Sequence, residues 1–145
     1  SDGMIGDSLI EAFGKSLNKS FGSLPGSTGK GAGVFTKVAK AAGIDSSGPY
    51  TGESYDAAAL IVLAMQAGGS ADRGSIAKNV MAVANGPGKK IYPGELKKAL
   101  DLLAKGKAVD YEGATGVVFT KVGEAEGSFL EKEIKYGKFK TKKQR

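Results

Sequence analysis

Apolar residues recur at the spacing of an α-helix in five stretches of the chain. These stretches cover residues 8–18, 35–42, 54–67, 75–84 and 93–104. Capping-box spacing opens the first stretch, a proline opens the last, and glycines follow the second and the last, as is typical of helix ends. The third stretch is apolar nearly all round, which indicates a helix that is buried on most sides. We therefore expect this helix to form the centre of the domain.

Short strands are expected on either side of these helices. Residues 21–24, 117–119 and 129–136 have strand composition, and a tight turn is expected where the third of these ends. Residues 26–33 are rich in glycine and predict a mobile surface loop. No repeat and no long linker divides the chain, so we expect an α/β fold with one core that extends to about residue 139.

The positive charge of the chain is concentrated at its end. The formal net charge is +6, from 21 Lys and Arg residues against 15 Asp and Glu residues. Up to Ile134 there are fifteen residues of each sign, so the body of the chain is neutral. The six remaining cations are Lys135, Lys138, Lys140, Lys142, Lys143 and Arg145. We expect residues 140–145 to form a basic tail in water and expect no nucleic-acid binding, although a nucleic-acid binder stays an alternative that a steep salt dependence would reveal.

The absence of cysteine and histidine argues against most hydrolase mechanisms and against metal sites built from thiolate or imidazole ligands. Without these residues there is no thiol nucleophile, no thiolate or imidazole metal ligand and no Ser-His-Asp triad. We therefore expect a protein that is not an enzyme and that holds no metal and no cofactor. The compartment stays open, because an exported protein without disulfides and a cytosolic protein can have the same composition.

Three further features could carry chemistry. The Gly29-Lys30 segment lacks the first glycine and the hydroxyl of a phosphate-binding P-loop, so a surface loop is the better interpretation. The carboxylates within residues 110–112 and 124–126 lie near turns among hydrophilic neighbours and are interpreted as exposed to water. Asp56, in the first turn of the buried helix, is interpreted as a structural partner of the helix dipole.

The chain shows neither a membrane span nor a signal peptide. Its longest apolar run, residues 57–67, is interrupted by Gln66 and is far shorter than the about twenty residues of a membrane-spanning helix. The first four residues, Ser1-Asp2-Gly3-Met4, are polar and begin abruptly. We expect such a start in a processed protein or in a fragment of a longer one.

Five short segments, in this order and spacing, resemble one protein family. The segments are Ser1-Asp2-Gly3-Met4, Leu24-Pro25-Gly26, Gly48-Pro49-Tyr50 followed by Ser54-Tyr55-Asp56-Ala57-Ala58-Ala59-Leu60, Val83-Ala84-Asn85-Gly86-Pro87-Gly88, and Asp110-Tyr111-Glu112-Gly113-Ala114-Thr115-Gly116-Val117-Val118-Phe119. Together they resemble the second, C-terminal lobe of ABC-transporter solute-binding proteins of the branched-chain amino acid type, which are Leu/Ile/Val-binding, type I periplasmic binding proteins. The resemblance covers the chain from Asp2 to about Phe139.

The resemblance implies a fold, a function and partners. The fold would be a three-layer α/β lobe with a short, mostly parallel sheet flanked by helices, incomplete without an upstream N-terminal lobe. The function would be extracytoplasmic capture of an amino acid or a related small amide or carboxylate for an ABC importer, by closure of two lobes on the ligand. Its partners would be that ligand, the missing N-terminal lobe and an ABC permease, and we expect a monomer. A cytosolic small-molecule-sensing regulator of the same fold is the alternative.

The resemblance also points to two ligand-binding residues. It implies that Asp2 binds the ammonium group of an amino acid and that Tyr50 reaches the ligand from the same lobe. A carboxylate that pairs with an ammonium in a closed cleft forms a strong hydrogen bond, and tyrosine adds a large apolar face. The family's best-known members have Glu where this chain has Asp2, so the ligand itself stays open. Two alternatives also stay open: Asp2 as a terminal turn residue, and Tyr50 as a core aromatic that caps the long helix.

Overall fold

The computed structural model describes residues 2–145, apart from the side chain of Asp2. Its helices and strands follow one another as η1 (Asp2–Met4), α1 (Asp7–Phe13), η2 (Gly14–Leu17), β1 (Phe21–Pro25), α2 (Lys30–Ala41), α3 (Thr51–Gly68), α4 (Arg73–Ala84), β2 (Lys89–Ile91), α5 (Leu96–Ala104), β3 (Val109–Tyr111), β4 (Val118–Phe119), β5 (Ala125–Glu126), β6 (Phe129–Lys135) and β7 (Lys138–Gln144). The mixture of helices and small sheets confirms the predicted α/β class. Within residues 2–145, none of the helices is both long and apolar enough to cross a membrane.

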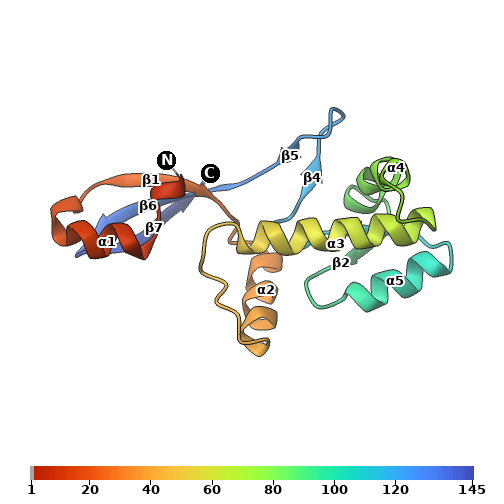
Figure 1. The fold of residues 1–145 in the computed structure, drawn as a ribbon, viewed down its shortest axis with the longest axis horizontal. Coiled ribbons are helices and arrows are strands. Elements are labelled where there is room, and N and C mark those ends of the chain that lie inside the picture. Colours follow the sequence, from red (N-terminus) through yellow and green to blue (C-terminus); the bar gives the residue numbers. More distant parts are fainter. Residues whose placement is uncertain (1) are drawn as a thin grey trace.

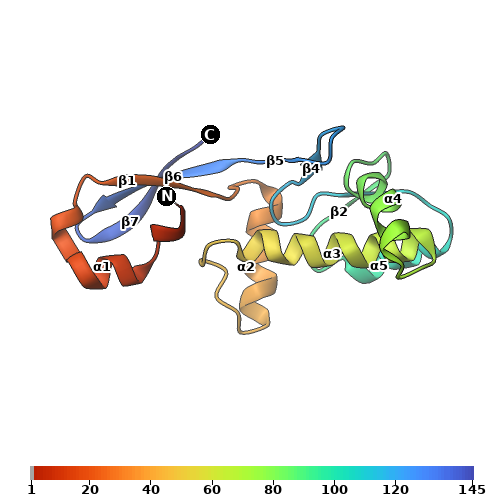
Figure 2. The same cartoon turned by 45° about the horizontal axis from the view of Figure 1, so that its top comes forward.

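The elements pack in two groups, and the chain crosses from one group to the other twice (Figure 1). The first group contains the sheet β1–β6–β7 with η1, α1 and η2 beside it, and the second contains α2 to α5 with β2 to β5. The chain passes from the first group to the second after Pro25 and returns before Phe129, as Figure 2 also shows. The described residues divide their contacts between these two groups. The expectation that residues 1–139 make up one lobe stays a prediction.

The second group is built around α3, as the hydrophobic pattern predicted. This helix packs against α4 and α5, and β3 lies against both α4 and α5. The buried core residues are Ala59, Leu60, Leu63, Ala64, Val83, Ala84, Ile91, Ala99, Val109 and Tyr111. A smaller cluster of Phe35, Ala39 and Ala114 attaches α2 to the same body. Only one side of α3 is covered, however, because Ile61 and Val62 are 48% and 39% exposed.

The strand pairing differs from the mostly parallel sheet that was expected. Only β2 and β3 pair in parallel, with Ile91 opposite Tyr111. The pairs β1–β6, β6–β7 and β4–β5 are all antiparallel. For two of these pairs the reason is the length of the connection: a tight turn at Tyr136 and Gly137 joins β6 to β7, and a short turn joins β4 to β5, and such connections return the chain antiparallel. The parallel pair is joined by a crossover that contains α5.

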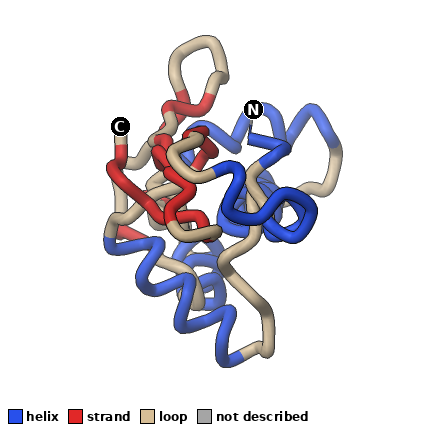
Figure 3. The backbone as a smooth tube through the Cα atoms, turned by 90° about the vertical axis from the view of Figure 1, so that its left-hand side faces the viewer, coloured by secondary structure: helices blue, strands red, loops and turns tan. Residues whose placement is uncertain are grey.

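The basic residues at the end of the chain lie in a strand. The prediction that residues 140–145 form a separate tail was therefore wrong. β7 pairs with β6 from Lys138 to Gln144, and Arg145 exchanges two backbone hydrogen bonds with Phe129. In Figure 3, which looks at the first group from its outer end, β7 is one of the strands drawn in red. A lysine-rich strand at the edge of a sheet discourages pairing with other chains, which gives these charges a structural account.

The helix ends lie close to the predicted positions, with two exceptions. The first helix ends early, at Phe13, and continues as the 3-10 helix η2. The glycine-rich segment expected to be a loop contributes the start of α2, because the helix begins at Lys30 rather than near Phe35. The strands β2, β3 and β5 were not predicted; each has only two or three residues, which is too short for a periodic pattern to show.

Substitution of a core leucine tests the central position of α3. Leu63 is completely buried, so Leu63→Ala should lower the free energy of unfolding by about 2–5 kcal/mol through lost burial and the cavity that remains. The matched control is Ile61→Ala, on the exposed side of the same helix, which should change it by about 0.5 kcal/mol or less. Urea denaturation measures both values, and equal losses would contradict this account of the core.

Candidate functional site

The carboxylate of Asp56 is buried in the second group, where four donors satisfy it. The Tyr111 hydroxyl and the Ala114 backbone N–H donate to Oδ1, each at 2.8 Å. The backbone N–H and the hydroxyl of Thr115 donate to Oδ2, again at 2.8 Å. Burying a carboxylate is costly unless donors of this kind replace water, so the bonds fix α3 against the turn at residues 113–116. Asp56 is therefore structural, as expected, but it acts through this turn rather than through the helix dipole.

The surroundings of Asp56 are adapted to its charge. Burial raises the pKa of the Tyr111 hydroxyl, and the neighbouring Asp56 carboxylate raises it further, so the phenol stays protonated and donates. Gly113 has a φ of +57°, and a Cβ at this position would overlap with the Asp56 carboxylate. A Cβ on Gly31, in the first turn of α2, would overlap with the carbonyl oxygen of Gly113. Both glycines thus permit the close packing of α2, α3 and the turn.

The start of α3 is shaped by the segment that precedes it. Tyr50 occupies the N-cap position with a φ of +62°, in the left-handed region that few residues other than glycine adopt. The hydroxyl of Thr51 donates to the carbonyls of Ser46 and Gly48, both at 3.0 Å. These bonds hold residues 46–48 as a loop around the first turn of the helix. The tyrosine side chain is 41% exposed, so the alternative of a core aromatic is wrong.

Two hollows lie where the chain crosses between the groups, and we call them together the crossover cleft. The Tyr50 hollow has a volume of about 230 Å³, and the Phe119 hollow has a volume of about 330 Å³. Both are lined by Pro25, Gly26, Glu53 and Thr115. The two crossing segments lie side by side here, since the backbone N–H of Gly26 donates to the carbonyl of Ser128 at 3.1 Å.

The two hollows differ in character. The Tyr50 hollow has a mixed lining, in which Ser46, Ser47, Glu53 and Lys132 are polar or charged and Leu24, Phe35 and Leu130 are apolar. The Phe119 hollow is lined mainly by apolar residues, among them Leu60, Val117, Phe119 and Phe129. Pockets for drug-sized ligands have volumes of about 300–1,000 Å³, so the Tyr50 hollow, at about 230 Å³, is of a size for a smaller molecule.

The structure places one of the two expected ligand-binding residues in this cleft. Tyr50 lines the Tyr50 hollow from the N-terminus of α3. The backbone of Asp2 begins the short helix η1, but its side chain lies outside the described residues. Asp2 belongs to the first packing group and Tyr50 to the second. That both residues bind one ligand stays a prediction.

Two charged residues of the cleft were not singled out from the sequence. Lys132 lies on β6 between Leu130 and Ile134, and the alternation of the strand places all three on one face. Glu53 lies in the first turn of α3, one turn before Asp56. A lysine in the middle of an otherwise apolar strand face was the available signal for the first, whereas nothing in the local sequence distinguishes Glu53 from an ordinary helix-start carboxylate.

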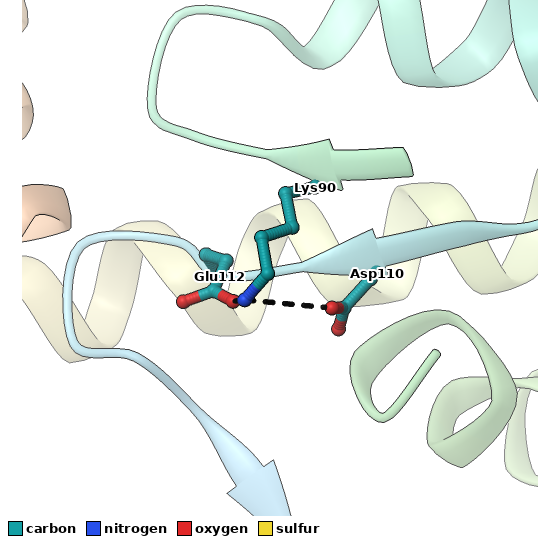
Figure 4. Close-up of polar contacts among 3 residues, drawn as sticks. All are labelled: Lys90, Asp110 and Glu112. Carbon is teal, nitrogen blue, oxygen red and sulfur yellow. Dashed lines mark hydrogen bonds and ion pairs between the residues drawn. The ribbon is translucent and has the colours of Figure 1, made fainter. Parts of the chain in front are cut away.

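Of the other carboxylates considered from the sequence, Glu126 lines the Phe119 hollow, whereas Asp110 and Glu112 lie away from this cleft. Asp110 and Tyr111 belong to β3, and Asp110 and Glu112 flank the ammonium of Lys90 on the surface (Figure 4). Lys90 pairs closely with Glu112 and lies 3.9 Å from Asp110. The Glu112 hydrogen bond and charge raise the pKa of Lys90, which is the effect of a surface ion pair. Asp110 and Glu112 are therefore already partnered and suggest no separate site.

A larger hollow, of about 810 Å³, lies on the open face of the sheet β1–β6–β7. Its charged residues already pair with one another, because Glu131 lies 2.9 Å from Arg145 and 3.6 Å from Lys142. This pairing lowers the pKa of Glu131, chiefly through the Arg145 hydrogen bond. We therefore regard the crossover cleft as the candidate site.

Comparison with known proteins shows which fold this is. No protein-family model matches the chain. The chain is similar to the crystal structure of the leucine-binding protein LivK from Thermotoga maritima, with a TM-score of 0.67 and 20% identity, over 99% of this chain and 35% of that one. It is also 40% identical over 70 residues to the chemotactic signal transduction system substrate-binding protein BasB of Halobacterium salinarum, a match that covers 48% of this chain and 17% of BasB. The chain thus has the fold of part of a leucine-binding protein and spans only a minor share of either relative.

Removal of the buried carboxylate tests its structural role. Asp56→Ala should lower the free energy of unfolding by more than about 2 kcal/mol, because the Tyr111 hydroxyl and two backbone N–H groups would be left buried without an acceptor. Asp110→Ala, which breaks only a surface ion pair, is the control and should cost about 1 kcal/mol or less. Denaturation curves of the two variants compare the losses; a similar loss in both would refute the role of the network.

Two glycines with left-handed backbone provide a second test. Gly116→Ala should cost about 1–2 kcal/mol, from the backbone conformation alone, since its φ is +70° and its surroundings are open. Gly113→Ala should cost clearly more, because its methyl group would also meet Asp56 and Tyr111. The difference between the two unfolding free energies isolates the packing around Asp56, and no difference would show that this packing is loose.

Proposed function

We propose that this chain is the C-terminal part of a solute-binding protein that captures an amino acid or a related small amide or carboxylate. The observation that carries the proposal is the small hollow beside Tyr50, of mixed polar and apolar lining, at the junction of the two packing groups. The likeness to LivK, which is a leucine-binding protein, and to BasB, which is a substrate-binding protein, supports this function. No bond is made or broken in this role, so the protein is proposed to act as a binding protein rather than as an enzyme.

The proposed mechanism is closure on the ligand. A solute in the crossover cleft would contact side chains from both packing groups. Its binding energy would therefore favour one position of the first packing group relative to the second. Tyr50 would supply an apolar face and one hydroxyl, and Asp2 would pair with the ammonium of the ligand, as the family resemblance implies. The rest of the site would come from an N-terminal lobe.

We further propose that the protein works outside the cytoplasm, delivers its solute to an ABC permease and is a monomer. The capture of nutrients for an importer is the role that the family resemblance implies.

A sensing role is the second candidate. BasB is named for a chemotactic signal transduction system, so a protein similar to it could report a solute to a receptor rather than deliver it to a permease. Both roles use the same ligand-binding step, and they differ in the membrane partner. Co-purification of the full-length protein with permease or with receptor components distinguishes them.

Titration of the chain with amino acids tests the shared binding step. The isolated chain holds only part of the site, so we expect weak, millimolar binding of L-leucine, seen by NMR as shifts of backbone amides near Tyr50 and Glu53. Tyr50→Ala should remove these shifts. The matched control is Tyr136→Ala, since Tyr136 is also exposed and has a φ of +57° but lies in the turn between β6 and β7.

Two outcomes would contradict the proposal. Tight binding of an amino acid by this chain, measured by calorimetry, would show that no further lobe is needed. Shifts that are absent for all amino acids at tens of millimolar, or that Tyr50→Ala leaves unchanged, would show that the Tyr50 hollow is not the site.

A further inference from the structure

The turn between β6 and β7 lies at the end of the first group that faces away from the second group (Figure 1). In the sheet, Pro25 lies opposite Phe129 next to the crossings, and Phe21 lies opposite Glu133 at the other end. The turn at Tyr136 follows that other end. The Tyr136 side chain is 72% exposed. The hairpin therefore presents a large aromatic side chain at its tip.

Five exposed lysines lie at or beside this turn. They are Lys15, Lys19, Lys135, Lys138 and Lys140. Two of them place their ammonium groups over the Tyr136 ring, Lys135 at 5.7 Å and Lys140 at 5.9 Å from the ring centre. We call the five lysines together with Tyr136 the basic tip.

Two of the five lysines reach the turn from the start of the chain. The backbone N–H of Gly137 donates to the side-chain oxygen of Asn18 at 3.0 Å, and the backbone N–H of Lys19 donates to the carbonyl of Ile134 at 2.9 Å. A Cβ on Gly137 would lie 3.7 Å from Cγ of Lys15, so the aliphatic part of this lysine lies beside the turn. These contacts hold η2 against the end of the hairpin, which brings together charges that are far apart in the sequence.

The charges of the basic tip are not neutralised by neighbouring carboxylates. Among the side chains that the structure describes, none of the five lysines forms an ion pair. Glu133 lies opposite Lys140 in the sheet but makes no ion pair with it. Further along β7, in contrast, Lys142 and Arg145 both pair with Glu131. The unpaired positive charge is therefore concentrated at the turn.

Protection of an edge strand does not account for the whole of the basic tip. Cations on β7 discourage pairing with other chains, but Lys15, Lys19 and Lys135 lie outside that strand. Like charges that are held close together repel one another, so a surface of opposite charge would bind them favourably. Tyr136 adds an apolar ring with one polar hydroxyl, which is the character of side chains at the boundary between water and lipid.

We propose that the basic tip binds the anionic surface of a lipid bilayer, with its lysines among the headgroups and Tyr136 at the same depth. A turn at the end of a hairpin fits a broad surface that needs no pocket, and none of the three hollows described above is lined by these lysines. Because the tip lies at the opposite end of the sheet from the crossings, this contact leaves the crossover cleft open to solutes. The inference goes beyond the proposed capture of a solute.

Co-sedimentation with lipid vesicles tests the proposed surface. At low ionic strength the chain should bind vesicles of one part phosphatidylglycerol to two parts phosphatidylcholine, and it should not bind vesicles of phosphatidylcholine alone. Added salt should release it. The triple variant Lys135→Gln/Lys138→Gln/Lys140→Gln should bind the anionic vesicles about a hundredfold more weakly, since each lysine near an anionic bilayer contributes about fivefold.

A second triple variant separates the basic tip from net charge. Lys37→Gln/Lys40→Gln/Lys107→Gln removes three exposed lysines of the second group and lowers the net charge by the same amount. It should bind the anionic vesicles nearly as well as the unmodified chain. An equal loss in the two triple variants would show that net charge alone drives binding and would overturn the inference.

A fluorescent reporter tests whether the turn itself meets the lipid. The chain contains no tryptophan, so Tyr136→Trp introduces a single one at the tip. Its emission should shift to shorter wavelength when anionic vesicles are added, because the ring leaves water. The matched control is Val122→Trp, at an 81% exposed position in the turn between β4 and β5, and its emission should not shift. The same response at both positions would contradict the placement of the tip on the bilayer.

Two further outcomes decide between this inference and others. Single-stranded nucleic acid also offers negative charge and rings for stacking, so binding of an oligothymidylate in preference to the anionic vesicles would overturn the membrane assignment. A chain that shifts with L-leucine near Tyr50 but does not bind the anionic vesicles would keep the proposed function and lose the basic tip as a membrane surface.

Discussion

The buried carboxylate of Asp56 is the interaction on which the geometry of the cleft depends. Its charge must be compensated without a cation, and the four donors that do so come from a strand end and a turn far away in the sequence. Meeting this requirement fixes the turn at residues 113–116 against α3, and the absence of a side chain at Gly31 lets α2 pack onto the same turn. The walls formed by Glu53 and Thr115 follow from this arrangement, because both residues belong to the segments that Asp56 joins.

The cleft lies between two bodies rather than within one. The chain leaves the antiparallel sheet after Pro25 and returns to it at Phe129, and these crossings are joined by backbone hydrogen bonds. A site at such a junction couples binding to the relative position of the bodies, which a site inside either core would not do.

The distribution of charge follows the same division. The excess of lysine at the end of the chain suggested a tail, and in the structure it forms the edge strand of the sheet. Lys132, on the neighbouring strand, is different from these residues because it is partly buried and lines the cleft. Counting charges along the sequence cannot make this distinction, since it depends on which face of the strand is covered.

The sequence by itself determined the helices and the class of the fold. The period of apolar residues located α3 and α4 closely, and strand composition located β1 and β6, because these signals arise from neighbours along the chain. Family resemblance pointed to Tyr50, which the structure places in the cleft. Only the tertiary structure decided that β2 pairs with β3, that Asp56 is satisfied by Tyr111 and Thr115, and that Glu53 and Lys132 share one hollow. Each of these depends on contacts between residues about twenty to eighty positions apart, and no local pattern encodes such contacts.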